Sequence, residues 1–116
     1  MAKKIFVVNY DNEEDIFSLF REGSKSKFSF DIELPQGDIV VDFGFDGQIV
    51  GLEFFNASDY FPFLKNIKNG KEIRADMKVN YGKDWAFIMY QISVPGIEPF
   101  SNTLISPYNK ELVISH

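Results

Sequence analysis

Cysteine is absent from the 116 residues of this chain. Its absence excludes disulfides, thiol nucleophiles and zinc sites that are built on thiolate ligands. Histidine occurs once, as the final residue His116, and chain ends are usually poorly ordered. A serine nucleophile would therefore lack its usual base. We expect no catalytic residues of the serine- or cysteine-hydrolase type.

Basic residues are in the minority. Twelve lysines and arginines stand against seventeen aspartates and glutamates, which gives a net charge of −5 and a sequence pI near 4.8. A protein that binds duplex nucleic acid needs a basic face for the phosphates. The charge therefore argues against nucleic acid as a direct partner, and it suits a basic protein partner or solubility alone.

Long apolar runs are missing as well. The N-terminal segment has two lysines and then only four apolar residues before Asn9, which is too short for a signal peptide. No later run approaches the length of a membrane span. We therefore expect a cytoplasmic protein that has no membrane partner.

The residues that are present indicate one globular, strand-rich domain over residues 1–116. The chain is 45% apolar and 25% charged, and its length suits a single core. Thirteen phenylalanines, with β-branched residues around them, favour strands.

Residues 38–58 form the strongest local pattern, two apolar runs joined by Asp46-Gly47. This dipeptide favours a two-residue type I′ hairpin loop, because both of its positions need a positive φ. Phe45 would then face Gln48. Since side chains alternate along a strand, one face of the hairpin would carry six apolar residues and form the core: Ile39, Val41, Phe43, Val50, Leu52 and Phe54.

Strand patterns precede this hairpin at residues 3–10, 16–20 and 28–34, the last with clean alternation of apolar and polar side chains. The simplest topology for residues 4–58 is an antiparallel β-meander of about five strands. The fold class is therefore mainly β, in the α+β sense, because one short helix is expected next.

Residues 59–116 are predicted to add a helix and a second hairpin. Ser58 or Asp59 can cap a short helix near residues 59–69. A second antiparallel hairpin is expected over residues 72–94, with Gly82-Lys83 as its two-residue loop and Tyr81 facing Asp84. Short C-terminal strands are expected at residues 103–106 and 112–115.

The first half of the chain carries a set of short motifs: Tyr10-Asp11, Glu14, Asp15, Asp42-Phe43, Asp46-Gly47, Val50-Gly51, Glu53 and Asn56-Ala57-Ser58. With these residues it resembles a prokaryotic family known as domain of unknown function 2283. The resemblance covers residues 4–58 and implies a small β-rich cytoplasmic protein with no assigned activity and no cofactor. It also suggests an antitoxin-like partner of a small basic protein.

Asp42 and Glu53 are the sharpest site candidates, because the predicted register makes them diagonal neighbours on the outer face of the hairpin. Gly44 and Gly51 would leave the backbone bare beside them. Two such carboxylates can hold a divalent cation or act as an acid/base pair. The structural alternative is that they accept hydrogen bonds from amides near residues 56–58, or pair with Arg21 or a lysine.

Two other groups are candidates. The acidic run at residues 11–15 lacks the spacing and the glycine of an EF-hand loop, so a solvated turn is expected. Trp85, Phe87 and Met89 share a face with charged residues of the second hairpin, which indicates an interface with a partner or with a second copy. The alternative is cover by the helix or by the last strands.

These observations favour a non-enzymatic protein-interaction module whose partner is another protein or the chain itself. The alternative is a metal-dependent enzyme or a metal-binding protein that uses Asp42 and Glu53. The two hypotheses differ in geometry. The enzyme needs this pair in an open, water-filled depression, whereas the interaction module needs the pair satisfied internally and exposed aromatic side chains elsewhere.

Overall fold

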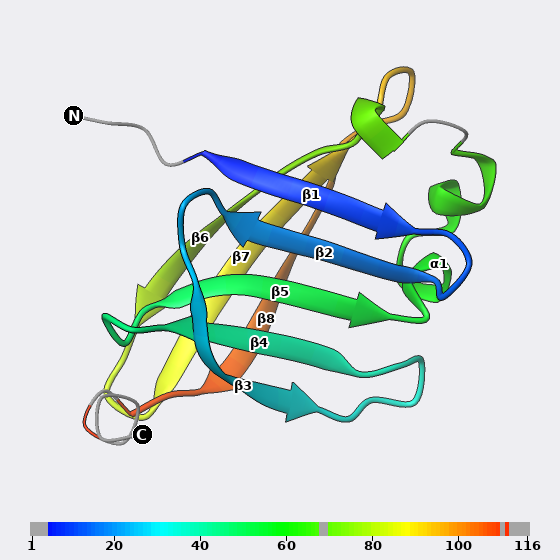
Figure 1. The fold of residues 1–116 in the computed structure, drawn as a ribbon. Helices are drawn as coiled ribbons and strands as arrows, with labels where there is room; N and C mark the ends of the chain where they lie inside the picture. Colours follow the sequence, from blue (N-terminus) through cyan, green and yellow to red (C-terminus); the bar gives the residue numbers. More distant parts are fainter. Residues whose placement is uncertain (1–4, 68–69, 110, 112–116) are drawn as a thin grey trace.

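A computed structural model describes residues 5–67, 70–109 and 111 of the chain. Two antiparallel sheets pack face to face, and their strands cross obliquely (Figure 1). The larger sheet holds β1 (Phe6–Asp11), β2 (Ile16–Arg21), β3 (Ser26–Ile32), β4 (Ile39–Gly44) and β5 (Ile49–Phe55). The smaller sheet holds β6 (Arg74–Tyr81), β7 (Trp85–Ser93) and β8 (Phe100–Pro107). The predicted mainly β fold is confirmed.

Along the chain, the segment between β5 and β6 forms short helical turns, α1 (Ala57–Tyr60), η1 (Pro62–Asn66) and η2 (Gly70–Glu72). The predicted helix near residues 59–69 is thus present only in pieces. Phe61 breaks it with φ −130° and ψ 83°, because the proline that follows disfavours the helical conformation at the residue before it. No helix among the described residues has the length and apolar content that crossing a membrane requires.

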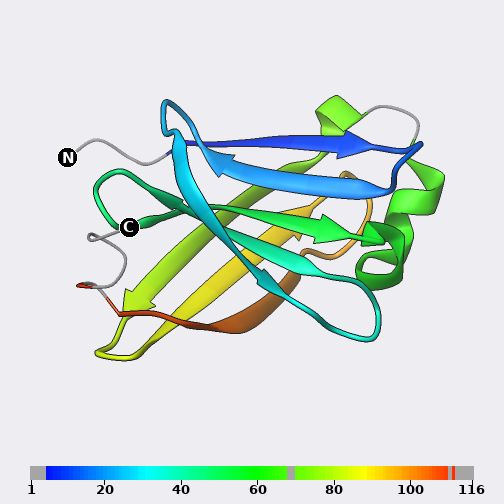
Figure 2. The ribbon, with the colours of Figure 1, turned by 60° about the horizontal axis from the view of Figure 1, so that its bottom comes forward.

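The five-stranded sheet is antiparallel as predicted, but its strand order is β1-β2-β5-β4-β3, which is not a meander. β2 pairs with β5, and residues 22–25 carry the chain across to the far edge (Figure 2). This pairing places Phe17 beside Phe54 and Leu19 beside Leu52, all fully buried. β3, whose Phe30 is 41% exposed, takes the edge. The order is that of a Greek key.

The β4–β5 hairpin keeps most of its predicted register. Ile39 faces Phe54 and Val41 faces Leu52, as expected. The predicted two-residue loop is wrong, however, because the N–H of Gly44 donates to the carbonyl of Gln48 at 2.8 Å. Three residues therefore form the loop. A type I turn closed by a glycine at φ +79° accounts for that length.

An extra residue in β5 compensates for the longer loop. Phe43 faces Ile49, whereas Asp42 faces Gly51, so Val50 has no opposite residue. This β-bulge turns Ile49 into the core in place of Val50. Five of the six predicted core positions thus lie in the cluster between the sheets, whereas Val50 is buried, at 1% exposure, outside that cluster.

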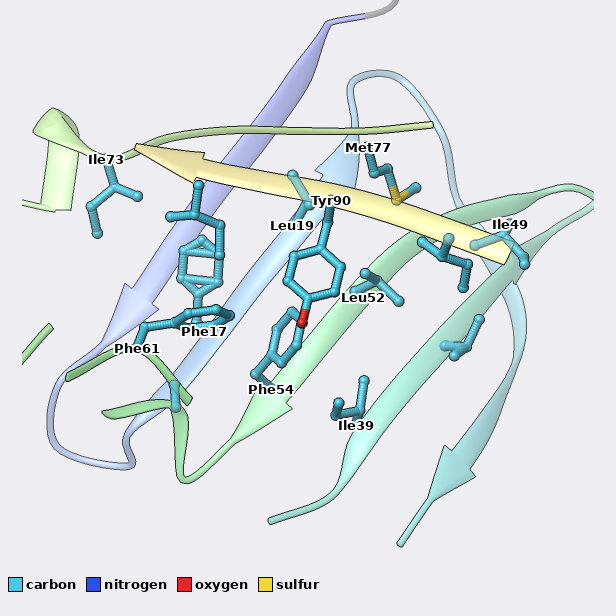
Figure 3. Packing of buried hydrophobic residues seen from close by; sticks show 14 of the residues in the cluster. Phe17, Leu19, Ile39, Ile49, Leu52, Phe54, Phe61, Ile73, Met77 and Tyr90 are labelled. Carbon is cyan, nitrogen blue, oxygen red and sulfur yellow. The ribbon is translucent and has the colours of Figure 1, made fainter. Parts of the chain in front are cut away.

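The core lies between the two sheets and draws on both (Figure 3). Its centre is aromatic, because the ring of Phe54 lies 5.0 Å from that of Phe61 and 5.2 Å from that of Tyr90. Edge-to-face contacts of this kind stabilise a core beyond simple area burial. Phe61 is fully buried here, although it interrupts the helix.

The second hairpin forms over β6 and β7, but its register differs from the prediction by two residues. Tyr81 faces Ala86 rather than Asp84, and Lys83-Asp84 forms the loop. A shift of two leaves every side chain on its predicted face, so Ala86 is buried as expected. β8 contains the predicted strand 103–106, whereas residues 112–115 and His116 lie outside the described residues.

Candidate functional site

Asp42 and Glu53 meet on the outer face of the larger sheet, as predicted. Asp42 faces Gly51 and Glu53 faces Val40, which makes the two carboxylates diagonal neighbours. Asp42 is only 2% exposed. Its Oδ1 accepts hydrogen bonds from the hydroxyls of two serines of β3, Ser29 and, at 3.4 Å, Ser26.

The other oxygen of this carboxylate, Asp42 Oδ2, is buried and lacks a donor when both acids are ionised. Burial, a hydrogen bond with Asp42 and the charge of Asp42 raise the pKa of Glu53 to about 7. A protonated Glu53 can donate to Oδ2, and this satisfies an acceptor that would otherwise cost free energy. The protonation of Glu53 is thus linked to its burial and to the neighbouring Asp42 carboxyl.

The two glycines beside this pair are not bare, which corrects the prediction. A Cβ on Gly51 would lie 2.3 Å from a ring carbon of Phe20, so that ring already occupies the space. A Cβ on Gly44 would lie 2.9 Å from a methyl group of Val50. The predicted notch is thus filled by side chains of the chain itself, and the pair does not lie in an open depression.

In the part of the chain that the structure describes, no further histidine, cysteine, aspartate or glutamate completes a metal site with Asp42 and Glu53. No group of three or more histidine, cysteine, aspartate or glutamate residues in these ranges could hold a metal ion. Asp42 and Glu53 offer two carboxylates, and one of them is covered. A calcium ion takes six to eight oxygen ligands.

The acidic run holds a structural contact that the sequence analysis missed. Asp15 accepts hydrogen bonds from the hydroxyl of Tyr10 at 2.7 Å, from the N–H of Ser58 at 3.0 Å and from the hydroxyl of Ser58 at 2.7 Å. The amides near residues 56–58 are therefore engaged by Asp15, not by Asp42 or Glu53. Asp15 has a positive φ of 56°, a conformation that aspartate tolerates better than most residues do. The sequence carried no stronger signal of this contact.

These hydrogen bonds also set the ionisation of their partners. Burial raises the pKa of Asp15, but the hydrogen bonds from Tyr10 and Ser58 outweigh it, and the pKa is lowered overall. Burial and the adjacent Asp15 raise the pKa of Tyr10 to about 12. Glu13 and Glu14 are exposed, as expected for a solvated turn.

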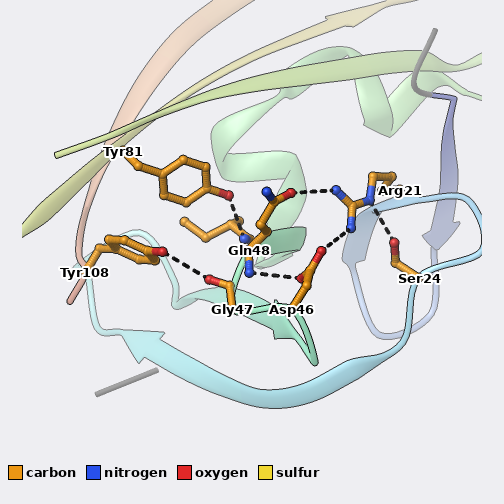
Figure 4. A network of polar contacts seen from close by, with 8 residues as sticks. Arg21, Ser24, Asp46, Gly47, Gln48, Tyr81 and Tyr108 are labelled. Atoms are coloured by element: carbon orange, nitrogen blue, oxygen red, sulfur yellow. Dashed lines mark hydrogen bonds and ion pairs between the residues drawn. The ribbon is translucent and has the colours of Figure 1, made fainter. Parts of the chain in front are cut away.

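A second network holds the β4–β5 loop from several sides (Figure 4). Arg21 contacts Asp46 at 3.4 Å and donates to the side chain of Gln48 at 3.1 Å. From the smaller sheet and the segment after it, the hydroxyl of Tyr81 accepts from the N–H of Ile49 at 2.8 Å, and the hydroxyl of Tyr108 donates to a loop carbonyl at 3.2 Å. Both sheets therefore position this loop.

The outer face of the smaller sheet carries the predicted aromatic residues. Trp85 is 53% exposed and Phe87 is 45% exposed, while Met89 is half-buried. Ile105 faces Phe87 from β8 and is also 53% exposed, a contribution that the sequence analysis missed. Pro107 faces Trp85. We call these five residues the aromatic face.

The alternative of intramolecular cover is wrong for the described residues. β8 lies beside β7 in the same sheet and does not cross its outer face. The helical segment instead inserts Phe61 and Leu64 into the core between the sheets. The face also has an open depression of about 520 Å³, which is lined by Met89, Lys78 and Gln91 among other residues.

The fold and these sites define a two-sheet antiparallel β protein with a β1–β2 turn held by the hydrogen bonds between Asp15 and Ser58, a buried acid pair and an exposed aromatic face. Residues 8–58 match the family described as "Protein of unknown function (DUF2283)". The resemblance seen in the sequence is thus confirmed over that segment, which comprises the larger sheet from within β1 onward and the start of α1. The smaller sheet lies outside the matched segment.

Two archaeal proteins are similar to the chain. An uncharacterized protein of Methanocaldococcus jannaschii is 38% identical over 65 residues, which are 52% of this chain and 53% of that protein. A Methanosarcina mazei protein named "Putative hypoxanthine phosphoribosyltransferase" is 32% identical over 81 residues, which are 69% of this chain and 64% of that protein. The chain thus spans between about half and two thirds of these relatives. No solved structure matches it.

Proposed function

We propose that this chain is a non-enzymatic protein-interaction module that binds a second copy of itself through the aromatic face. One observation carries the proposal. Trp85, Phe87 and Ile105 expose about half of their surface on two neighbouring strands, and Phe87 lies directly opposite Ile105. Contiguous exposed apolar side chains of this size are typical of interaction surfaces, and tryptophan is enriched at their centres.

The distribution of charge favours a second copy as the occupant. Around the aromatic face the exposed charges of β6 are mixed, with Arg74 and Lys78 flanking Asp76. The outer face of the larger sheet is acidic and carries Asp31 and Glu53. Two copies joined through their smaller sheets would turn their acidic faces outward, so that the charges of −5 per chain repel each other least.

The size of the face sets the expected affinity. Three strands of eight or nine residues cover a flat area of roughly 30 Å by 14 Å, from the usual strand rise and spacing. Stable dimers bury about 800 Å² of accessible surface per partner. The outer face of the smaller sheet, at roughly 420 Å², is only about half as large, so we expect a weak dimer of micromolar affinity.

Sedimentation velocity over a wide concentration range tests this proposal. We expect the wild-type chain to shift from monomer to dimer with concentration, and the emission of Trp85 to shift to the blue as it becomes covered. Phe87→Ser should weaken the association at least about tenfold, because a large buried contact is worth more than 1.4 kcal/mol. The matched control is Val7→Ser, since Val7 is 50% exposed on a strand of the other sheet.

Two outcomes would overturn the proposal. One is a wild-type chain that stays monomeric up to roughly 0.5 mM, well above micromolar affinity. The other is a dimer that Val7→Ser weakens as much as Phe87→Ser does. A monomer that instead binds a small basic protein through the acidic face would support the antitoxin-like alternative.

The two enzyme alternatives have less support. A metal-dependent reaction at Asp42 and Glu53 would need access to a carboxylate that is 2% exposed. The name of the Methanosarcina relative suggests a phosphoribosyltransferase as a further competitor. Phosphate groups often bind where a glycine-rich loop opens a helix, whereas Gly44, Gly47 and Gly51 of this chain lie in or beside a β-hairpin loop. The interaction proposal predicts no product from hypoxanthine and phosphoribosyl diphosphate.

A further inference from the structure

We propose that Asp42 and Glu53 share a single proton, and that this buried pair makes the attachment of edge strand β3 sensitive to pH. The inference is independent of the proposed dimer, because the pair lies on the opposite outer face. The proposed dimer uses this face only through the sign of its charge and makes no contact with the pair.

The first observation is the geometry of Asp42. This residue is only 2% exposed, and its two oxygens lie in different surroundings. Oδ1 accepts from Ser26 and Ser29, which are both on β3. Oδ2 is buried and has no donor among the described residues, and Glu53 is the acid that forms a hydrogen bond with Asp42. Asp42 therefore links the serines of β3 to the ionisation state of Glu53 on β5.

The second observation is the position of β3. It lies at the edge of the larger sheet and, among the described strands, pairs only with β4. Its register shifts between Ser26 and Phe28, and Phe30 is 41% exposed. An edge strand with an irregular ladder is among the first elements to open in a native protein. The two serine contacts to Asp42 lie in this weakly held strand.

Other charged groups on the strands around the pair are few. β3 contributes Asp31, which faces Val40, and Lys27. From β2, Ser18 faces Glu53, and Arg21 contacts Asp46 of the hairpin loop instead. Asp31 adds negative charge to this face. Lys27 of the same strand adds positive charge, and the raised pKa of Glu53 arises from its burial and from Asp42.

The direction of the effect follows from the pKa of Glu53, which is raised from its ordinary value of 4.5 to about 7. The folded protein holds this proton more tightly than the unfolded chain does. The stabilisation is therefore fully present below pH 4.5 and is lost as the pH rises through about 7. Above about pH 7 both carboxylates are ionised. Their repulsion then weakens the hydrogen bonds that Ser26 and Ser29 donate to Asp42.

Amide hydrogen exchange measured from pH 5.5 to 8.5 tests the inference on the full chain. After correction for intrinsic base catalysis, exchange of the β3 amides that pair with β4 should accelerate about tenfold or more across this range, since each pKa unit is worth a factor of ten. Amides of the β2–β5 ladder should change little. Carbon-detected titration should place the Glu53 carboxyl near neutral pH.

Glu53→Gln is the informative variant. Its amide can donate to Asp42 Oδ2 at every pH, so the acceleration of β3 exchange should disappear. Glu13→Gln is the matched control, because Glu13 is exposed in the β1–β2 turn. The inference is overturned if wild-type Glu53 titrates near 4.5, or if Glu53→Gln retains the pH-dependent exchange of β3. The wild-type titration decides the matter even if the variant does not fold.

Discussion

At the scale of single residues, the acidic side chains of this protein have different tasks that their sequence pattern does not separate. Asp15 accepts three hydrogen bonds from Tyr10 and Ser58. Asp42 is buried against two serines, and Asp46 contacts Arg21 at the surface. Burial and the supply of donors distinguish them, and both depend on strands that are distant in sequence.

Replacing Asp15 should destabilise the fold. We expect Asp15→Asn to lower the free energy of unfolding by about 2 kcal/mol, since hydrogen bonds to a charged acceptor are worth roughly 1.5–3 kcal/mol. Asparagine tolerates the positive φ at this position. Urea denaturation provides the measurement. The control is Asp11→Asn, because Asp11 accepts only from exposed amides of its own turn, and it should cost less than 1 kcal/mol.

The Asp15 contribution also has a defined pH dependence. The pKa of Asp15 is lowered from its ordinary value of 3.8, so the ionised form is the one that the folded state favours. Its stabilisation is present above pH 3.8 and is lost as the pH falls through the folded pKa. The difference between wild type and Asp15→Asn should therefore shrink in acid, and a constant difference would contradict this assignment.

At the scale of secondary-structure elements, the faces of strands could be predicted but their neighbours could not. Alternation places Ala86 and Ile88 inside whether Tyr81 faces residue 84 or 86, because a shift of two preserves the face. The pairing of β2 with β5 joins residues more than thirty positions apart, and no local pattern encodes it. The diagonal placement of Asp42 and Glu53 was predictable because both belong to one hairpin.

The loop of that hairpin shows where local chemistry misleads. Asp46-Gly47 suits a two-residue loop, yet Val50 bulges and the loop takes three residues. The bulge keeps Ile39 and Val41 in the predicted register while Ile49 enters the core. Burial of a large apolar side chain, worth roughly 1.5–3 kcal/mol, exceeds the preference of one dipeptide for one turn type.

The three-residue loop predicts a specific sensitivity to substitution. Gly47 has φ +79°, so Gly47→Ala should lower the free energy of unfolding by about 1 kcal/mol through backbone strain. Gly70→Ala is the control, because a Cβ there meets no atom within 4 Å and the residue has no positive φ. Thermal denaturation by circular dichroism compares the two. Equal melting temperatures would argue against the left-handed conformation at Gly47.

At the scale of the whole molecule, the two outer faces differ in character. The larger sheet presents acidic groups, and the smaller sheet presents the aromatic face with mixed charges at its side. The molecule is a slab of 42 × 38 × 21 Å, so these faces are separated by about two Debye lengths in 0.1 M salt. Each face can therefore act with little electrostatic influence from the other.

The net charge predicts how salt affects the proposed dimer. Two chains of charge −5 repel each other, and salt screens this repulsion. Raising sodium chloride from about 20 to about 200 mM should therefore tighten self-association, by roughly severalfold. Sedimentation equilibrium at both concentrations measures the change. Association that weakens with salt would mean that opposite charges, rather than apolar contact, hold the two copies together.

The hydrogen bonds between Asp15 and Ser58 have a consequence for how such chains can diversify. Ser58 is the last residue of the segment that matches the family. Its hydrogen bonds to Asp15 therefore join the end of this segment to the turn between β1 and β2. Whatever follows residue 58 need only shield the inner surface formed by Phe17, Leu52 and their neighbours. The five-stranded unit can therefore accept a different covering layer and keep the hydrogen bonds between Asp15 and Ser58.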